Sequence, residues 1–462
     1  MPQKPPLEIH PGNFSLNVSG VAGFFGGDEA ISAIQTIHHY KARKFLGWYN
    51  SPGSWAVGKN FGKLAKSDLW DGLFPGPDEE PAKFFELDGK QGPKYIASRS
   101  GTILEHTGHL AYLIMQMSKG ELGRKVEEGR ITKRNKITII KTQRVFDPLK
   151  PPDREILPCS RIQTFVAVLP IAVSFTTCTL CGCTYDWFCF SMILLGIVSS
   201  GIFSVVMGSA RLKLEGVNSA SPAPPGDGML MDGDNTVLLL GKEKDVATIT
   251  RGRFILEYDR WPIIDEYNAI GLTSLLLVIQ LLAQLLLIPQ GTLFGQIMFL
   301  VSFAASWAYN LYLSAINSED IQEQLIREEL HLKEEHMRTY IFRTRTSAAV
   351  FACLMLQPVD VEGKYVAADK WEGLGFKPEI IIQNFMPNDT QVWGTWRKKV
   401  LEVMKTRDGS KDTCDGLLKM SSEEETKFGE DGQKLLKLLL EDARIAYHLA
   451  MEENLKGWLK EK

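Results

Sequence analysis

The chain has 462 residues, of which 44% are hydrophobic and 23% charged, and its formal net charge is −3 at pH 7. This near balance of charge excludes the basic composition typical of nucleic-acid-binding domains, and we predict no nucleic-acid partner. The length leaves room for two or three folding units. Five of the seven cysteines fall between Cys159 and Cys189, which is not the pattern of a disulfide-stapled secreted domain.

The first 160 residues are predicted to form an N-terminal cytosolic region, 1–160, of mixed helix and strand. Asp28 is a suitable start for an amphipathic helix. Lys136–Phe146 has the composition of a strand, and the proline-rich Asp147–Pro158 indicates an extended linker. The N-terminus shows no basic segment followed by an apolar one, so we expect no cleavable signal peptide, and the first membrane helix would serve as its own insertion signal.

Four stretches without Asp, Glu, Lys or Arg follow, and they determine the fold class. They are Thr164–Tyr185, Phe188–Gly208, Ala269–Ile288 and Thr292–Leu313. About 20 apolar residues span a hydrocarbon layer of ~30 Å as a helix. We therefore predict a mainly α-helical integral membrane protein with two transmembrane hairpins (four spans), at 161–210 and 269–314, and the lipid bilayer as its partner.

The second apolar stretch carries small residues at a spacing of four. These are Gly196, Ser200, Ser204 and Gly208. Such a ridge lets another backbone approach closely. We expect it to pack within the monomer, and contact between copies in a homo-oligomer is the alternative.

The loop between the two hairpins, 211–268, is predicted to be cytosolic. It opens with Asn218–Gly228, whose Pro, Ser and Gly content is typical of disorder. Thr236–Leu240, Val246–Thr250 and Arg253–Tyr258 then have strand composition. They predict a small antiparallel β module within this loop.

Polar side chains recur on one face of each helix in the second hairpin. The residues are Thr273, Gln280, Gln284, Ser302, Ser306 and Asn310, with Gln296 at the edge of the face. Buried amides are costly unless paired, so these faces should meet each other or line the interior. The tight turn at Pro289-Gln290-Gly291 predicts that the two helices lie side by side. Hydrogen-bonded packing, a pore lining and a polar substrate pocket all remain open as roles.

The C-terminal region, 315–462, is predicted to be cytosolic and helical. Glu319–Phe342 should form a charged helix, and Ser347–Leu356 is apolar but too short to span a membrane. A helix after Pro387 bears Trp393 and Trp396, and packing on a protein surface is expected for it, with adhesion to a membrane surface as the alternative. The last helix covers about Gln433–Lys460.

The distribution of basic residues predicts the orientation. Neither hairpin turn contains Lys or Arg, whereas both are frequent before the first span, in the central loop and after the fourth span. The positive-inside rule then places both termini and the central loop in the cytoplasm. No ionisable side chain lies inside any span, which argues against proton-coupled transport but leaves a passive pore open.

No known catalytic or metal motif stands out. Asp232 to Glu243 has the length of a calcium loop, but Val237 occupies the position where glycine is required. The pairs His38-His39 and His106/His109 lack a clear helper ligand. We therefore predict no metal site and no cofactor, and assign no catalytic residue.

Two stretches, Asp186–Gly201 (DWFCFSMILLGIVSSG) and Ile288–Leu313 (IPQGTLFGQIMFLVSFAASWAYNLYL), the latter followed by SAINSEDIQ, carry a resemblance. The chain resembles, over roughly residues 150–400, a group of multi-pass membrane proteins of basidiomycete fungi. The resemblance implies a fungal internal or plasma membrane. It implies no activity, cofactor or catalytic residue.

These observations favour a non-catalytic helix-bundle platform that presents cytosolic domains. A membrane-bound enzyme acting on a lipophilic metabolite and an oligomeric passive channel are the alternatives. A pocket lined by Gln280, Gln284 and Asn310 and open toward Asp265 and Glu266 would favour the enzyme. The sequence specifies neither a small-molecule ligand nor an oligomeric state.

Overall fold

A computed structural model describes residues 25–39, 42–142, 161–217, 220, 223–258, 265–329, 336–359, 365–406 and 411–452. Its contacts divide the chain into two compact units. The helical unit comprises Met1–Gly89, Pro151–Leu214 and Phe254–Leu325, and the sheet unit comprises Lys90–Lys150, Glu215–Arg253 and Ile326–Lys462. The five consecutive regions predicted from sequence are therefore not the folding units, because regions 1–160, 211–268 and 315–462 are each shared between the two.

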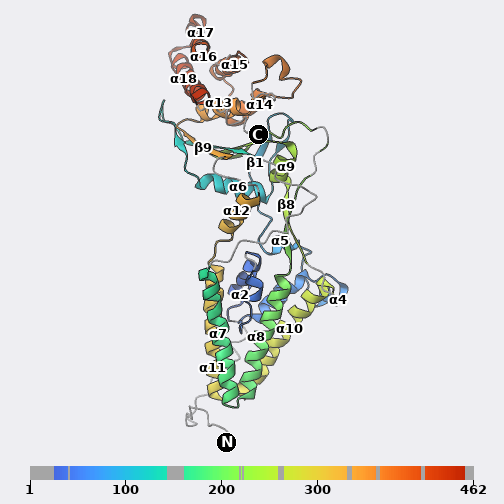
Figure 1. The fold of residues 1–462 in the computed structure, drawn as a ribbon. Coiled ribbons are helices and arrows are strands. Elements are labelled where there is room, and N and C mark those ends of the chain that lie inside the picture. Colours follow the sequence, from blue (N-terminus) through green and yellow to red (C-terminus); the bar gives the residue numbers. More distant parts are fainter. Residues whose placement is uncertain are drawn as a thin grey trace. The chain divides into compact units, whose positions relative to one another are not determined.

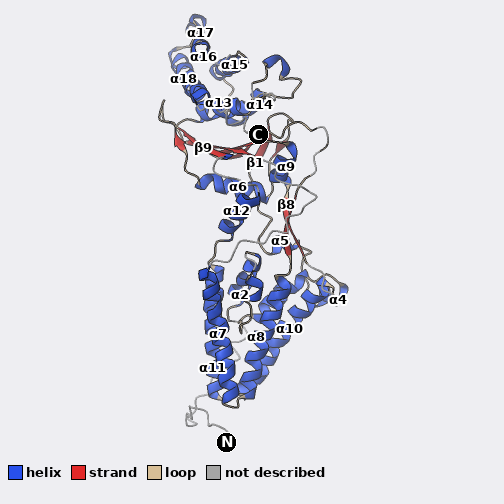
Figure 2. Ribbon diagram, viewed as in Figure 1, coloured by secondary structure: helices blue, strands red, loops and turns tan. Residues whose placement is uncertain are grey.

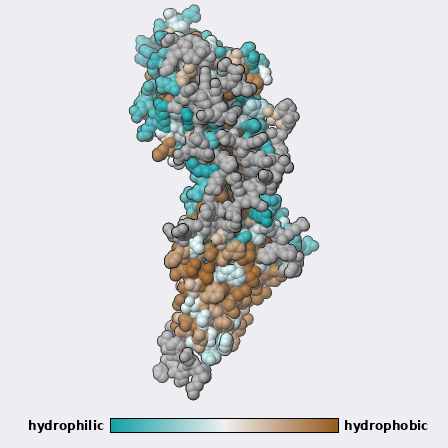
Figure 3. Space-filling view, in the orientation of Figure 1, coloured by the Kyte–Doolittle hydropathy of each residue, from teal (hydrophilic) through white to brown (hydrophobic). Residues whose placement is uncertain are grey.

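Four long helices form the frame of the helical unit (Figure 1): α7 (Arg161–Cys183), α8 (Trp187–Met207), α10 (Glu266–Leu287) and α11 (Leu293–Ser314). Within the described residues these four are long and apolar enough to cross a membrane, as the sequence predicted. At 1.5 Å per residue, the 21 residues of α8 reach about 31 Å. Large apolar side chains such as Phe165, Leu169 and Leu286 are exposed on the outside of these helices, and Figure 3 shows this part of the molecule as largely hydrophobic.

The pairing of the long helices differs from the prediction. The extensive contacts of α10 are with α8 and with a short helix, α3 (Ser54–Phe61), and those of α11 are with α7 and α2 (Gly27–Gln35). The two helices of the second hairpin, which are connected through η4 (Ile288–Gln290), do not lie side by side along their length. Short helices of the N-terminal region pack against the long helices: α3 contacts α10 and α2 contacts α11. Figure 1 shows α2 among the long helices.

The N-terminal part of the helical unit consists of short elements. They are α2, η1 (Thr36–His38), η2 (Arg43–Phe45), α3, η3 (Gly62–Leu64), α4 (Asp68–Leu73) and α5 (Pro81–Phe84). The helix expected from Asp28 is confirmed as α2, which buries Ala30, Ala33 and Ile34. Its contacts with α11 show that this stretch packs within the helical unit.

The sheet unit contains a seven-stranded mixed sheet in the order β2-β1-β6-β7-β4-β9-β3 (Figure 2). Its strands are β1 (Lys94–Ala97), β2 (Ile103–Leu104), β3 (Arg124–Lys125), β4 (Asn135–Lys141), β6 (Gly228–Asp232), β7 (Asn235–Leu240) and β9 (Met337–Phe342). The central strand β4 pairs in parallel with β7, with Lys136 opposite Asn235, and antiparallel with β9. Three separate stretches of chain thus build one sheet.

The predicted β module of the central loop is wrong as an independent unit. Thr236–Leu240 lies in β7, which joins strands from both flanking regions. Val246–Thr250 is not a strand but part of α9 (Glu243–Arg251), whose polar start and buried Val246 and Ile249 fit a helix. Arg253–Tyr258 contains β8 (Arg253–Glu257), which pairs with β5 (Arg211–Glu215) in a separate two-stranded sheet. The calcium-like spacing falls on the β6–β7 hairpin, where Gly233 has φ 59°.

Helices cover both faces of the large sheet. α6 (His109–Gly120) and α9 contact each other, and α6 packs on β6 and β7. The other face meets α13 (Arg345–Met355), α14 (Pro378–Phe385), α15 (Gln391–Lys405) and α18 (Glu430–Glu452) in one apolar core. The remaining elements are α12 (Ser318–Glu329), η6 (Ala368–Lys370), α16 (Lys411–Leu417) and α17 (Ser422–Lys427).

The apolar Ser347–Leu356 forms the buried centre of this core, as expected, since every residue of α13 from Thr346 to Met355 is buried. The tryptophan-bearing helix is α15, and its Trp393 and Trp396 are buried in the same core, so adhesion to a membrane surface is contradicted. The single helix expected over Glu319–Phe342 is wrong: α12 ends at Glu329 and Met337–Phe342 is the strand β9. Asp147–Pro158, residues 218, 219, 221 and 222, and the end of the last predicted helix lie outside the described residues.

Candidate functional site

Residues 42–53, which we call the inserted segment, run along α8 inside the helical unit. A Cβ atom built at Gly208 would lie 2.4 Å from the Cβ of Lys44, and one built at Gly196 would lie 1.9 Å from Asn50 Oδ1. The twelve helical residues between these contacts correspond to about 18 Å. The chain from Lys44 to Asn50, with its side chains, covers that distance. Asn50 therefore reaches the middle of α8.

The small-residue ridge of α8 is the groove in which this segment lies. A Cβ atom at Gly47 would be 2.0 Å from Ser204 Oγ and 3.3 Å from the carbonyl oxygen of Ser200. Gly201, which the sequence pattern did not single out, lies against the Trp48 ring, at 2.3 Å from the position of an added Cβ. The predicted ridge thus admits backbone and side chains of the same chain rather than another long helix.

The start of the inserted segment is fixed by Arg43. Its guanidinium is fully buried, lies 5.7 Å from the centroid of the Tyr309 ring, and donates a hydrogen bond to the carbonyl of Ala33 at 3.4 Å. A cation over an aromatic ring is stabilised by the negative face of the ring. These contacts tie the segment to both α2 and α11.

The polar face of α11 binds the inserted segment. The Tyr49 hydroxyl donates to Asn310 Oδ1 at 2.9 Å, and Asn310 Nδ2 donates to Ser51 Oγ at 3.2 Å. The backbone N–H of Asn50 donates to Ser174 Oγ on α7 at 3.1 Å, and that hydroxyl shares a hydrogen bond of 3.2 Å with Ser302 Oγ. The backbone N–H of Asn50 and the side chains of Tyr49 and Ser51 therefore have hydrogen-bond partners on α7 and α11.

The polar face of α10 reaches α8 and the same segment. Gln280 Oε1 accepts a hydrogen bond from Ser199 of α8. Gln284 Nε2 lies 3.5 Å from Asn50 Oδ1 and 3.4 Å from the carbonyl oxygen of Met192. The expectation that Gln280 or Gln284 would adjoin Ser302 or Ser306 is not met, because the inserted segment occupies the space between the two faces.

Five of the seven predicted polar-face residues thus converge on one buried region, which we call the polar core. Thr273 instead donates its hydroxyl to the carbonyl of Ala269 in its own helix. Gln280, Gln284, Ser302, Ser306 and Asn310 are each at most 1% exposed. Gln296 is elsewhere: its side chain donates to the carbonyl of Gly291 in the turn before α11, at 3.1 Å. The sequence pattern identified the polar residues of the long helices but not Tyr49, Asn50 and Ser51, which complete the region.

The polar core consists of neutral amides and hydroxyls. Among the described residues, Asn50 Nδ2, Gln280 Nε2, Gln284 Oε1 and Ser306 Oγ have no hydrogen-bond partner. Buried polar atoms of this kind are commonly paired by internal water. Such groups can bind and orient, but none of them is a general acid or base suited to neutral pH.

Asp186 lies between α7 and α8, where its carboxylate connects the starts of α8 and α11. The sequence pattern assigned it no role. Its carboxylate is 3% exposed and accepts the backbone N–H of Cys189 at 3.1 Å, which caps α8. It also accepts the backbone N–H and the hydroxyl of Thr292, each at 2.7 Å. Thr292 in turn caps α11. One carboxylate therefore joins the starts of two long helices.

Comparison of the chain with models of protein families, with curated protein sequences and with solved structures finds no match.

Proposed function

We propose that the chain is an integral membrane anchor whose four-helix bundle is closed by its own N-terminal segment and which presents the sheet unit on one side of the membrane. The observation that carries this proposal is the position of the inserted segment. Tyr49, Asn50 and Ser51 take part of the hydrogen-bonding capacity of the polar faces that would otherwise line a pathway or pocket.

The construction of the sheet supports a one-sided arrangement. β4 precedes the first long helix, β7 lies between the second and third, and β9 follows the fourth, yet all three are adjacent in one sheet. Strands separated by a bilayer cannot share a hydrogen-bonded ladder. This adjacency supports a location of all three stretches on the same side of the membrane, as do the basic residues that flank the spans on that side.

A passive channel and a membrane enzyme remain the second candidates, and the polar core is the feature that would serve either. The three amides expected to line an enzyme pocket, Gln280, Gln284 and Asn310, are fully buried and contact protein. This arrangement favours hydrogen-bonded packing over a ligand pocket open to Asp265 and Glu266.

Labelling of sealed vesicles with a membrane-impermeant maleimide tests the topology. In a Cys183→Ser background, Gly233→Cys lies in the β6–β7 turn and Trp187→Cys lies at the exposed start of α8. We expect these two positions to react from opposite faces of the membrane, with Gly233→Cys accessible from the cytoplasmic face. Reaction of both from one face would refute the proposed arrangement.

Flux through the purified protein in liposomes separates the anchor from the channel. We expect no ion or small-solute flux above that of empty liposomes. Flux that Gln284→Leu abolishes without loss of folded protein would refute the anchor and establish the polar core as a pathway.

A further inference from the structure

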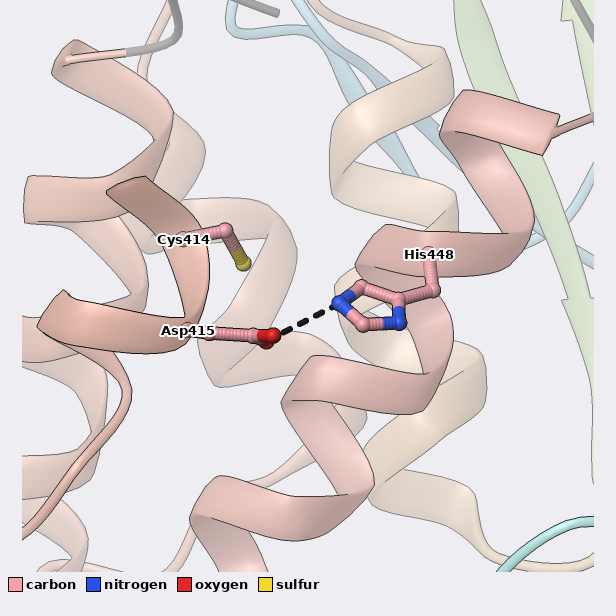
Figure 4. A group of neighbouring side chains, drawn as sticks. All are labelled: Cys414, Asp415 and His448. Atoms are coloured by element: carbon pink, nitrogen blue, oxygen red, sulfur yellow. Dashed lines mark hydrogen bonds and ion pairs between the residues drawn. The ribbon is translucent and has the colours of Figure 1, made fainter. Parts of the chain in front are cut away.

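A second group of chemically active side chains lies in the sheet unit, apart from the polar core. Cys414 and Asp415 are on α16, and His448 is on α18 (Figure 4). His448 Nε2 and Asp415 Oδ1 are 2.9 Å apart. One potential ligand atom from each of the three residues lies within 4.8 Å of the other two. No sequence motif marks this group, because Asp415 and His448 are 33 positions apart.

We propose that Cys414, Asp415 and His448 form a zinc-binding site that links α16 to α18. Thiolate, imidazole and carboxylate together make the donor set that Zn²⁺ favours over magnesium or calcium, which prefer oxygen ligands alone. Three protein ligands leave a fourth tetrahedral position for water.

The separations fit a site that closes on its metal. Zinc bonds of about 2.0–2.3 Å at tetrahedral angles place neighbouring ligand atoms about 3.3–3.6 Å apart. The pair His448–Asp415 is a little closer than this, at 2.9 Å, and all three ligand atoms lie within 4.8 Å of one another.

Burial of the thiol and exposure of its partners favour a metal over a nucleophilic cysteine. Cys414 is 1% exposed, so a substrate carbonyl cannot reach its sulfur as the structure stands. The side chains of His448 and Asp415 are 27% and 34% exposed, which gives a small ion an entry route. Figure 4 shows the sulfur of Cys414 on the same side as the paired His448 and Asp415.

The charges around the group also suit a cation. Arg444, the nearest basic residue of α18, is paired with Glu441 at 2.6 Å. Its pKa is raised chiefly by that hydrogen bond with Glu441, and further by Asp415 and Cys414. Arg444 is therefore paired with Glu441, and it leaves Asp415 free to bind a cation together with Cys414 and His448.

Cobalt substitution in the full-length, detergent-purified protein tests the proposal. After chelation, titration with Co²⁺ should produce thiolate-to-cobalt charge transfer in the near ultraviolet and visible bands typical of tetrahedral cobalt. Both should saturate at one ion per chain and vanish when Zn²⁺ is added. We expect Cys414→Ser to remove the charge-transfer band and His448→Gln to weaken cobalt affinity at least tenfold.

Cys353→Ser is the matched control, because Cys353 is a buried thiol of the same unit whose sulfur contacts the Pro378 carbonyl rather than the group. It should retain the full signal. Zinc should also raise the unfolding temperature of the wild type but not of His448→Gln, which provides a readout if Cys414→Ser fails to fold. A wild type without the charge-transfer band, or a band that persists in Cys414→Ser, would overturn the proposal. The site is independent of the anchoring role proposed above.

Discussion

Replacement of Gly196 by alanine should displace the inserted segment from the bundle. The new Cβ would lie 1.9 Å from Asn50 Oδ1 and 2.9 Å from Asn50 Cγ, so Asn50 would have to move by more than 1 Å. Asn50 is held by Ser174 on one side and Gln284 on the other. Overpacking of this kind costs about 1–3 kcal/mol, and the better helix propensity of alanine returns up to about 1 kcal/mol.

These two terms leave a net loss of about 0–3 kcal/mol, and we expect Gly196→Ala to lower the free energy of unfolding by about 1–2 kcal/mol, the middle of that range. Gly182→Ala in α7 is the control, since its nearest neighbour is the edge of the movable Phe190 ring at 3.3 Å, and it should be close to neutral. Unfolding in detergent, followed by tryptophan fluorescence, measures both.

Limited trypsin digestion gives a second readout of the same change. Arg43 is fully buried in the wild type, so cleavage after it should be slow, and Gly196→Ala should accelerate it while Gly182→Ala does not. If Gly196→Ala matches Gly182→Ala in both stability and cleavage rate, the packing of Asn50 against Gly196 is incorrect.

Three further changes probe the bundle. Asp186→Asn should lower the free energy of unfolding by about 1–3 kcal/mol, because an amide nitrogen would face backbone donors, and thermal denaturation with Asp186→Glu as comparison measures it. Gln284→Leu should cost only about 1–2 kcal/mol, the scale of hydrogen bonds within membranes, and a larger loss in the same assay would contradict a packing role. Burial lowers the pKa of His38 to about 3 and that of His39 to about 4. The unfolded chain therefore binds protons that the folded chain does not, and stability should fall as the pH drops from about 6.5 toward 4, by about 1.4 kcal/mol per histidine and pH unit. Unfolding midpoints across this range should show a flatter dependence when both histidines are replaced by glutamine.

The long helices were predictable because their signal is local. An apolar run of some 20 residues crosses lipid as a helix, and Pro289-Gln290-Gly291 marks the turn between the last two long helices. The burial of α13 followed in the same way, because an apolar helix of 11 residues is too short to span and must be covered by protein.

The inserted segment and the large sheet were not predictable from local pattern. Residues 46–53 carry no apolar run that would predict their burial. Their position along α8 becomes apparent only in the structure, where three glycines of that region each contact one residue of the inserted segment: Gly196 contacts Asn50, Gly201 contacts Trp48 and Gly208 contacts Lys44. Likewise, β7 matches a strand by composition, but its partners β4 and β6 come from different sides of the first hairpin. Both features depend on contacts between residues distant in sequence.

Cysteine cross-linking within the membrane-embedded protein tests the position of the inserted segment most directly. The Cβ position at Gly47 is 2.4 Å from Ser204 Cβ, so a small separation of the two backbones meets the 3.5–4.5 Å that a disulfide requires. Gly47→Cys paired with Ser204→Cys should form a disulfide rapidly under mild oxidation. Gly47→Cys paired with Ser191→Cys, which is exposed on α8 and about 20 Å further along it, should not. Equal cross-linking of the two pairs, or none in either, would contradict a bundle closed by its own N-terminal segment.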